Sequence, residues 1–219
     1  MRTIRRGFPF TSLCAWAGIA GPAAFTAAWT VSSVRQAEYS IAAEHISGLA
    51  APDARNPHVM TAGFLALGVC TTAFSRALEE GLGGRHRAGV APVLVRAAGL
   101  GVLAAGTLRR DRMLLRPPDE VVDRQSWRND GHDIASAVVY ATVVAAPLAL
   151  AWRCRDDPEW RVLATPAAAT SAVAGILLAV YATGVLEPWN GIVQRVAVTV
   201  PGAAMAVLST RLLRRAAGA

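Results

Sequence analysis

Residues 134–152 read IASAVVYATVVAAPLALAW, a run without a single charged side chain. A helix needs about 20 predominantly apolar residues to cross the hydrocarbon core of a bilayer. The run is rich in Ala, Val and Leu, and it lacks the alternation of apolar and polar residues that a membrane β-barrel strand requires. It therefore predicts a membrane-spanning α-helix.

Other apolar runs of similar length precede and follow this one. Lipid offers no hydrogen-bond partner to the backbone, so each run must satisfy its own amide groups as a helix. We therefore expect an all-α fold, a single integral membrane domain over residues 1–219 with six transmembrane helices. The expected spans are about 12–31, 57–74, 89–108, 134–152, 162–185 and 193–213.

Composition agrees with a membrane protein. Of 219 residues 53% are hydrophobic and only 17% are charged, and the mean hydropathy is +0.36. Soluble domains carry about 45–50% apolar and about 25% charged residues. A soluble enzyme, a disordered chain and a secreted disulfide scaffold are therefore disfavoured, and none of the three cysteines forms a CxxC pair.

The net charge of +7 comes from arginines that flank the apolar runs. No block of base-stacking aromatic residues accompanies them, so we expect the bilayer, and no nucleic acid, as their partner. With six spans, both chain ends and the connections after the second and fourth spans lie on one side of the membrane. These segments together carry twelve arginines and only five acidic residues. The positive-inside rule then predicts a cell inner-membrane protein with both termini cytoplasmic.

Two longer connections, 32–56 and 109–133, lie on the extracytoplasmic side in this topology. In the first, residues 38–49 place Tyr39, Ile46 and Leu49 on one face of a helical projection. This pattern predicts a short amphipathic helix lying on the membrane. Glu38 and His45 fall near its apolar side, so they either reach water at the edge of that face or turn inward over the bundle.

The fourth span carries a polar line on one face. His132, Ser136 and Tyr140 recur every four residues, the spacing that places side chains on the same side of a helix. Polar groups inside a membrane usually point into the bundle, where they either pack between helices or form a site.

The sixth span begins with further polar residues, Gln194 and Arg195. Arg195 can reach lipid head groups, pair with an acidic residue, or bind a carboxylate or phosphate ligand. The candidate ligand-binding residues all fall on the same side of the membrane: Glu38, His45, Asp111, His132, Asp133, Ser136, Gln194 and Arg195.

Acid–base chemistry would use His132 with His45 or Asp133, which are the candidate catalytic residues. The chain has no HExxH, HxxxH or paired-cysteine spacing, and no GxGxxG, Walker or nucleophile-elbow motif. We therefore expect no metal site and no cofactor.

Several motifs together resemble the Domain of Unknown Function 998 (DUF998) membrane proteins of bacteria and archaea. They are Tyr39-Ser40, residues 46–52 (ISGLAAP), residues 56–57 (NP) and 60–64 (MTAGF), a Gly-rich third span ending near Asp111, His132 at the start of the fourth span, and residues 191–195 (GIVQR). The resemblance implies a six-helix membrane protein and no particular reaction. Residues 109–112 read RRDR where the family typically has Asp-Pro.

Three functions remain open from the sequence. The first is a polar extracytoplasmic pocket for a lipid or other amphiphile, in which His132 and Arg195 line the same space. The second is a membrane-embedded enzyme acting on a lipidic or isoprenoid substrate. The third is an accessory or scaffold subunit without a pocket.

Overall fold

The structure, a computed structural model, describes residues 9–114 and 125–218. Across these ranges every regular element is a helix. Six are long: α1 (Pro9–Arg35), α2 (Pro57–Gly81), α4 (Ala91–Thr107), α5 (Trp127–Cys154), α6 (Ala164–Thr183) and α7 (Asn190–Ala216). Four are short: η1 (Ile46–Ala50), α3 (Arg85–Ala88), η2 (Arg161–Leu163) and η3 (Glu187–Trp189). The expectation of an all-α fold is confirmed for the described residues.

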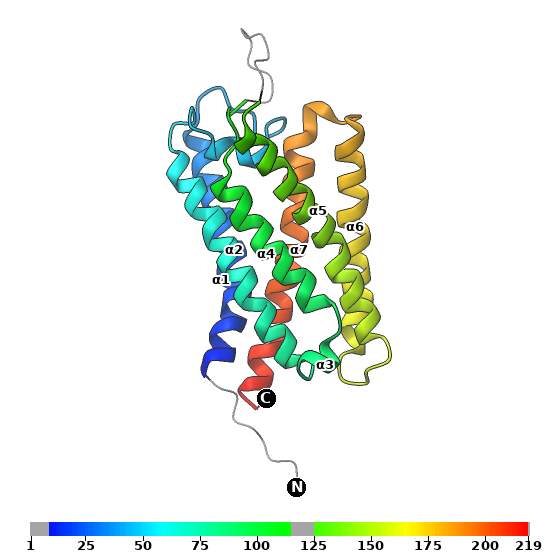
Figure 1. Cartoon of the computed structure of the whole chain (residues 1–219). Coiled ribbons are helices and arrows are strands. Elements are labelled where there is room, and N and C mark those ends of the chain that lie inside the picture. The colour runs from blue at the N-terminus through cyan, green and yellow to red at the C-terminus, as the bar shows by residue number, and fades with distance from the viewer. Residues whose placement is uncertain (1–8, 115–124, 219) are drawn as a thin grey trace.

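The six long helices form a closed ring (Figure 1). Each packs against the next long helix in the chain, and α7 returns to pack against α1. Consecutive long helices are therefore neighbours in space, and the contact of α7 with α1 closes the ring.

The two ends of the ring differ. The start of α1, the end of α7, α3 and the α5–η2 connection lie at one end, which we call the terminal end (Figure 1). Residues 36–56, the segments that follow α4 and precede α5, and η3 lie at the other, which we call the loop end. Both described chain ends are thus on the same side of the bundle. Arg2, Arg5 and Arg6, which contributed to the charge argument, lie outside the described residues.

Helix boundaries have local causes. Pro57 is the first residue of α2. A backbone N–H at this position would have no acceptor within the helix, so proline, which lacks it, costs no hydrogen bond. Ser126 caps α5, and its side chain accepts a hydrogen bond from the Asn129 N–H. Gly184, at φ 69°, ends α6 in the left-handed region that suits glycine. The capping residue Ser126 lies in a polar stretch before the apolar run. Helix α5 therefore begins seven residues before the run, 134–152, that predicted it.

Two apolar clusters hold the ring together. At the terminal end, Phe74, Leu78 and Trp160 belong to one cluster. At the loop end, Leu49 of η1 and Phe64 of α2 belong to another. Both clusters join side chains from opposite parts of the chain, so packing rather than any single helix stabilises the ring.

Four segments are long and apolar enough to cross a membrane by length and composition: α2, α5, η2 with α6, and η3 with α7. The 17-residue α4 is also apolar but shorter. The outside of the ring exposes large apolar side chains from every long helix, among them Trp16, Val69, Leu100, Leu148, Ile176 and Val196. Such a surface is expected to face lipid rather than water.

The amphipathic helix predicted over residues 38–49 is wrong. The segment forms turns followed by η1, whose five residues are all buried within the loop end. In an α-helix the Ile46 N–H would donate to the Ala42 carbonyl. Instead the Ala42 carbonyl accepts from the Ile192 N–H at 3.1 Å, and the Ile46 N–H donates to Gln194 Oε1 at 2.8 Å. Groups from α7 thus replace the helical hydrogen bonds.

Candidate functional site

A cavity of about 480 Å³ occupies the centre of the ring. All six long helices contribute to its wall, and Ile46 and Ser47 of η1 border it at the loop end. On α5 the lining runs from His132 to Leu150, which is about 27 Å at 1.5 Å per residue. This length approaches the roughly 30 Å thickness of a bilayer's hydrocarbon core.

The wall is apolar along most of its length. Phe74, Val102, Val139 and Leu208 are typical of it. Polar side chains gather at the loop end and are contributed by η1, α5 and α7: Ser47, His132, Ser136, Tyr140 and Gln194. The predicted polar line on α5 therefore faces this cavity. None of the described lining residues is Asp, Glu, Lys or Arg.

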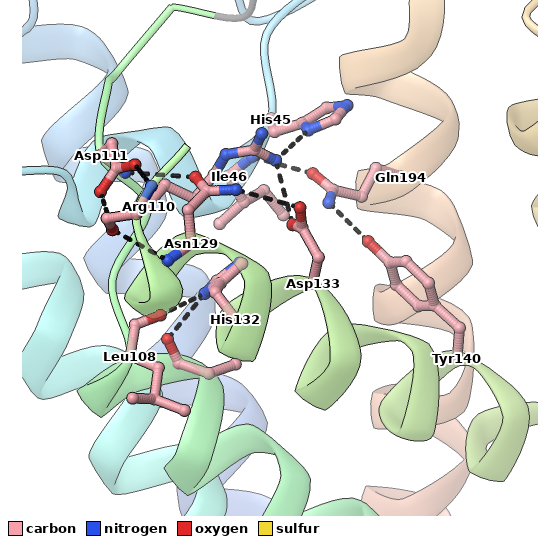
Figure 2. Close-up of polar contacts among 12 residues, drawn as sticks. His45, Ile46, Leu108, Arg110, Asp111, Asn129, His132, Asp133, Tyr140 and Gln194 are labelled. Atoms are coloured by element: carbon pink, nitrogen blue, oxygen red, sulfur yellow. Dashed lines mark hydrogen bonds and ion pairs between the residues drawn. The ribbon is translucent and has the colours of Figure 1, made fainter. Parts of the chain in front are cut away.

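His132 is 3% exposed, and its side chain hydrogen-bonds carbonyl groups at the end of α4. Its Nδ1 lies 2.8 Å from the Ala105 carbonyl oxygen and 2.9 Å from that of Leu108 (Figure 2). The last carbonyls of a helix have no partner within it, so they need a donor from elsewhere. Nδ1 must carry hydrogen to serve them, which leaves Nε2 of the neutral ring as an acceptor.

Gln194 joins three elements at the loop end. Its Oε1 accepts the Ile46 N–H from η1 at 2.8 Å, and its Nε2 donates to Tyr140 Oη of α5 at 2.7 Å (Figure 2). The side chain is 6% exposed. Both ends of the amide are therefore occupied, and Gln194 fixes η1 over the cavity.

Arg195 turns toward the loop rather than the cavity, and it is not among the residues that line the cavity. Its Nη1 donates to the carbonyls of Ile41, Glu44 and Gly191 at 2.9–3.0 Å. Its Nη2 donates to Tyr39 Oη at 2.6 Å. Burial raises the pKa of Tyr39, although the Arg195 charge opposes this effect. We expected Arg195 and His132 to line one pocket, but only His132 lines the cavity.

His45 lies above the cavity between α6 and the segment after α4. Its Nε2 is 2.5 Å from Tyr181 Oη. Its Nδ1 is 3.3 Å from Arg110 Nη1 (Figure 2). Burial and the Arg110 charge lower the pKa of His45 to about 3. The ring is therefore neutral, and because Arg110 can only donate, Nδ1 accepts and Nε2 donates to Tyr181.

Asp133 and Asp111 hold the segment around the start of α5. Asp133 is half exposed and lies 3.8 Å from Arg110, and it accepts from Asn129 Nδ2 at 3.0 Å. Asp111 accepts both the N–H and the O–H of Ser126, at 2.8 and 2.5 Å. These two hydrogen bonds lower the pKa of Asp111. Asp111 therefore anchors the N-cap of α5 and does not line the cavity.

The three candidate catalytic residues divide between two places. His132 lines the cavity, whereas His45 and Asp133 share Arg110 above it. Glu38 is exposed, in the left-handed region at φ 61°. Among the residues that the structure describes, no three His, Cys, Asp or Glu side chains gather as metal ligands.

Sequence reasoning missed two contributors, Tyr181 and Arg110. Tyr181 lies inside an apolar span and resembles an interfacial aromatic residue, so its contact with His45, 136 positions away, left no local signal. Arg110 is one of three arginines in residues 109–112. Only the fold shows which of them turns inward.

Comparison with known proteins identifies the family. No curated protein and no solved structure matches the chain. A family model described as "Protein of unknown function (DUF998)" matches residues 19–211, from within α1 to within α7. Since this match covers nearly the whole chain, the protein belongs to the DUF998 family.

Proposed function

We propose that the protein is a multi-pass protein of the bacterial inner membrane, which crosses the bilayer six times and binds a lipid or other amphiphile in its central cavity. The terminal end faces the cytoplasm in this proposal, and the loop end faces outward. The observation that carries it is the long, mostly apolar cavity, which η1 borders at the loop end, where most of the polar lining side chains gather.

Six crossings follow from the ring. Four of its segments are long and apolar enough to span, and α1 and α4 complete the ring between them. α4 packs between α2 and α5, so it must lie at the same depth as they do. Its 17 residues extend about 26 Å, at the short end of the range for spanning helices.

The size and the wall of the cavity favour an apolar occupant. Ligand pockets commonly measure about 300–1,000 Å³ and are mostly apolar with a few polar groups. An empty space of about 480 Å³ would deprive its wall of van der Waals contacts, which is destabilising. A hydrocarbon chain would restore these contacts along the axis of the ring.

Neighbouring alanines on α6 allow a direct test. Ala167 is buried and lines the cavity, whereas Ala168 is exposed on the outside of the ring. The protein and the variants Ala167→Phe and Ala168→Phe are purified in the same detergent, and the retained lipid is extracted and quantified by mass spectrometry.

We expect the unaltered protein and Ala168→Phe to retain lipid at a constant ratio to protein. Ala167→Phe should lose it, because the ring occupies the cavity. All three must elute as a single species of the same size, which controls for folding. Retention of the same amount of lipid by both variants would overturn the proposal, as would the absence of retained lipid above a detergent-only control.

A further inference from the structure

The loop end of the cavity offers a head group no charged partner. The nearest charged groups of the site are engaged elsewhere, Arg110 with His45 and Asp133 and Arg195 with the loop carbonyls and Tyr39. A charged head group placed here would lose its hydration without gaining an ion pair, which is strongly unfavourable. The wall therefore selects an uncharged head.

Three polar atoms at this end remain available to a ligand. Ser47 Oγ, His132 Nε2 and Ser136 Oγ have no hydrogen-bond partner in residues 9–114 and 125–218, and all three residues line the cavity. His132 and Ser136 lie one helical turn apart on α5, so their side chains are neighbours. By contrast, the Thr142 hydroxyl donates to carbonyls of its own helix, and the Gln194 amide is held by its hydrogen bonds to Ile46 and Tyr140.

These atoms specify the chemistry of the head. The Ala105 and Leu108 carbonyls hold the hydrogen on Nδ1, so Nε2 can only accept a hydrogen bond. It requires a donor from the ligand, and Ser136 can donate in return to the ligand's oxygen. An ester or ketone has no hydrogen to give, and a carboxylate is both charged and acceptor-only at neutral pH.

We infer that the amphiphile in the cavity carries an uncharged hydroxyl head, which donates to His132 Nε2 and accepts from Ser136 Oγ while its single apolar chain extends toward the terminal end. This inference rests on the proposed function, because it names the class of ligand for the same cavity. Long-chain alcohols and monoacylglycerols share this chemistry.

Probes with one chain and different heads test the inference. Binding of oleyl alcohol, methyl oleate and oleate to the purified protein is measured by competition with radiolabelled oleyl alcohol at pH 7.5. We expect methyl oleate to bind about five- to tenfold more weakly than the alcohol, the effect of one lost hydrogen bond, and oleate to bind more weakly still. 1-Monooleoylglycerol, tested in parallel, shows whether a glycerol head is preferred to a simple alcohol.

Variants connect the preference to the two residues. His132→Asn keeps a donor near the position of Nδ1 for the α4 carbonyls but removes Nε2, so the alcohol should lose its advantage over the ester. Ser136→Ala should weaken both probes about five- to tenfold. Thr142→Val is the matched control, because its hydroxyl lines the same cavity but bonds within α5, and it should change neither affinity.

The outcomes separate this inference from the proposed function. If all three probes bind equally, or oleate binds most tightly, the hydroxyl head is wrong even though Ala167→Phe abolishes binding. If no probe binds and the Ala167→Phe and Ala168→Phe proteins retain equal lipid, the proposed function fails as well. If His132→Asn does not fold, Ser136→Ala and the probe series still decide the question.

Discussion

Arg195 brings a permanent positive charge into the packed loop end, where it is only 5% exposed. Its guanidinium serves three carbonyls and one phenol, and it also lies 5.2 Å from the centroid of the Trp29 ring. The planar fork of an arginine suits such divergent acceptors better than a lysine ammonium. Arg195 is therefore best explained as the residue that ties the first loop to α7.

Arg195→Met should destabilise the loop end without preventing membrane insertion. The carbonyls of Ile41, Glu44 and Gly191 would lose a charged donor, and a hydrogen bond to a charged group contributes about 1.5–3 kcal/mol. We expect a lower melting temperature in detergent and faster hydrogen exchange in residues 39–45. Arg128→Met, at an exposed position of the same end, is the control. Equal effects of the two substitutions would contradict this role.

His45 predicts a pH dependence of stability. Its pKa is about 3 in the folded protein and about 6.5 when unfolded, so between these values the unfolded chain binds a proton that the folded chain does not. Stability therefore falls as the pH falls through this window, by about 2 kcal/mol at pH 5 relative to pH 8. His45→Gln, which cannot titrate, should remove this part of the slope in melting curves recorded from pH 8 to 5. An unchanged slope would contradict the prediction, because it would mean that folding does not shift the pKa of His45.

At the scale of elements, the first loop shows what a local pattern cannot predict. The spacing of Tyr39, Ile46 and Leu49 correctly marks side chains that are at least partly buried. It does not predict how their backbone groups are satisfied, because those partners come from Ile192 and Gln194 on α7, about 150 positions away. The periodicity therefore indicated burial correctly and the helix incorrectly.

Gly191 makes this docking possible and can be tested. A Cβ at this position would lie 2.5–2.8 Å from the carbonyl oxygens of Ile41, Ala42 and Glu44, closer than real contacts allow. Gly191→Ala should therefore push the loop away from α7, lower the melting temperature and expose residues 36–45 to protease. Gly175→Ala is the control, because its Cβ would meet only Val144 at an ordinary 3.6 Å and alanine favours the helix. Undiminished protease resistance in Gly191→Ala would contradict the docking argument.

At the scale of the molecule, hydropathy located the helices but not the ring. Each predicted apolar run lies largely within one of the six long helices. Each segment in lipid must satisfy its own backbone hydrogen bonds, so its helical structure can be predicted from its own residues. Which helices become neighbours depends on packing between distant residues, such as Gly99, whose added Cβ would lie 2.3 Å from Thr72 Oγ1. The cavity exists only once the ring has closed. Only then do His132, which lines the cavity, and Arg195, which turns toward the first loop, take their different positions.

The orientation of the ring is the last prediction. Arginines outnumber acidic residues at the terminal end, and the positive-inside rule places such an end in the cytoplasm. On a background lacking Cys14, Cys70 and Cys154, single cysteines are introduced as Glu38→Cys at the loop end and Asp156→Cys at the terminal end, both at exposed positions. A membrane-impermeant maleimide should label Glu38→Cys in intact spheroplasts and Asp156→Cys only after lysis. The reverse pattern would invert the topology, and labelling of both cysteines in intact spheroplasts would mean that the two ends of the ring are not separated by the membrane.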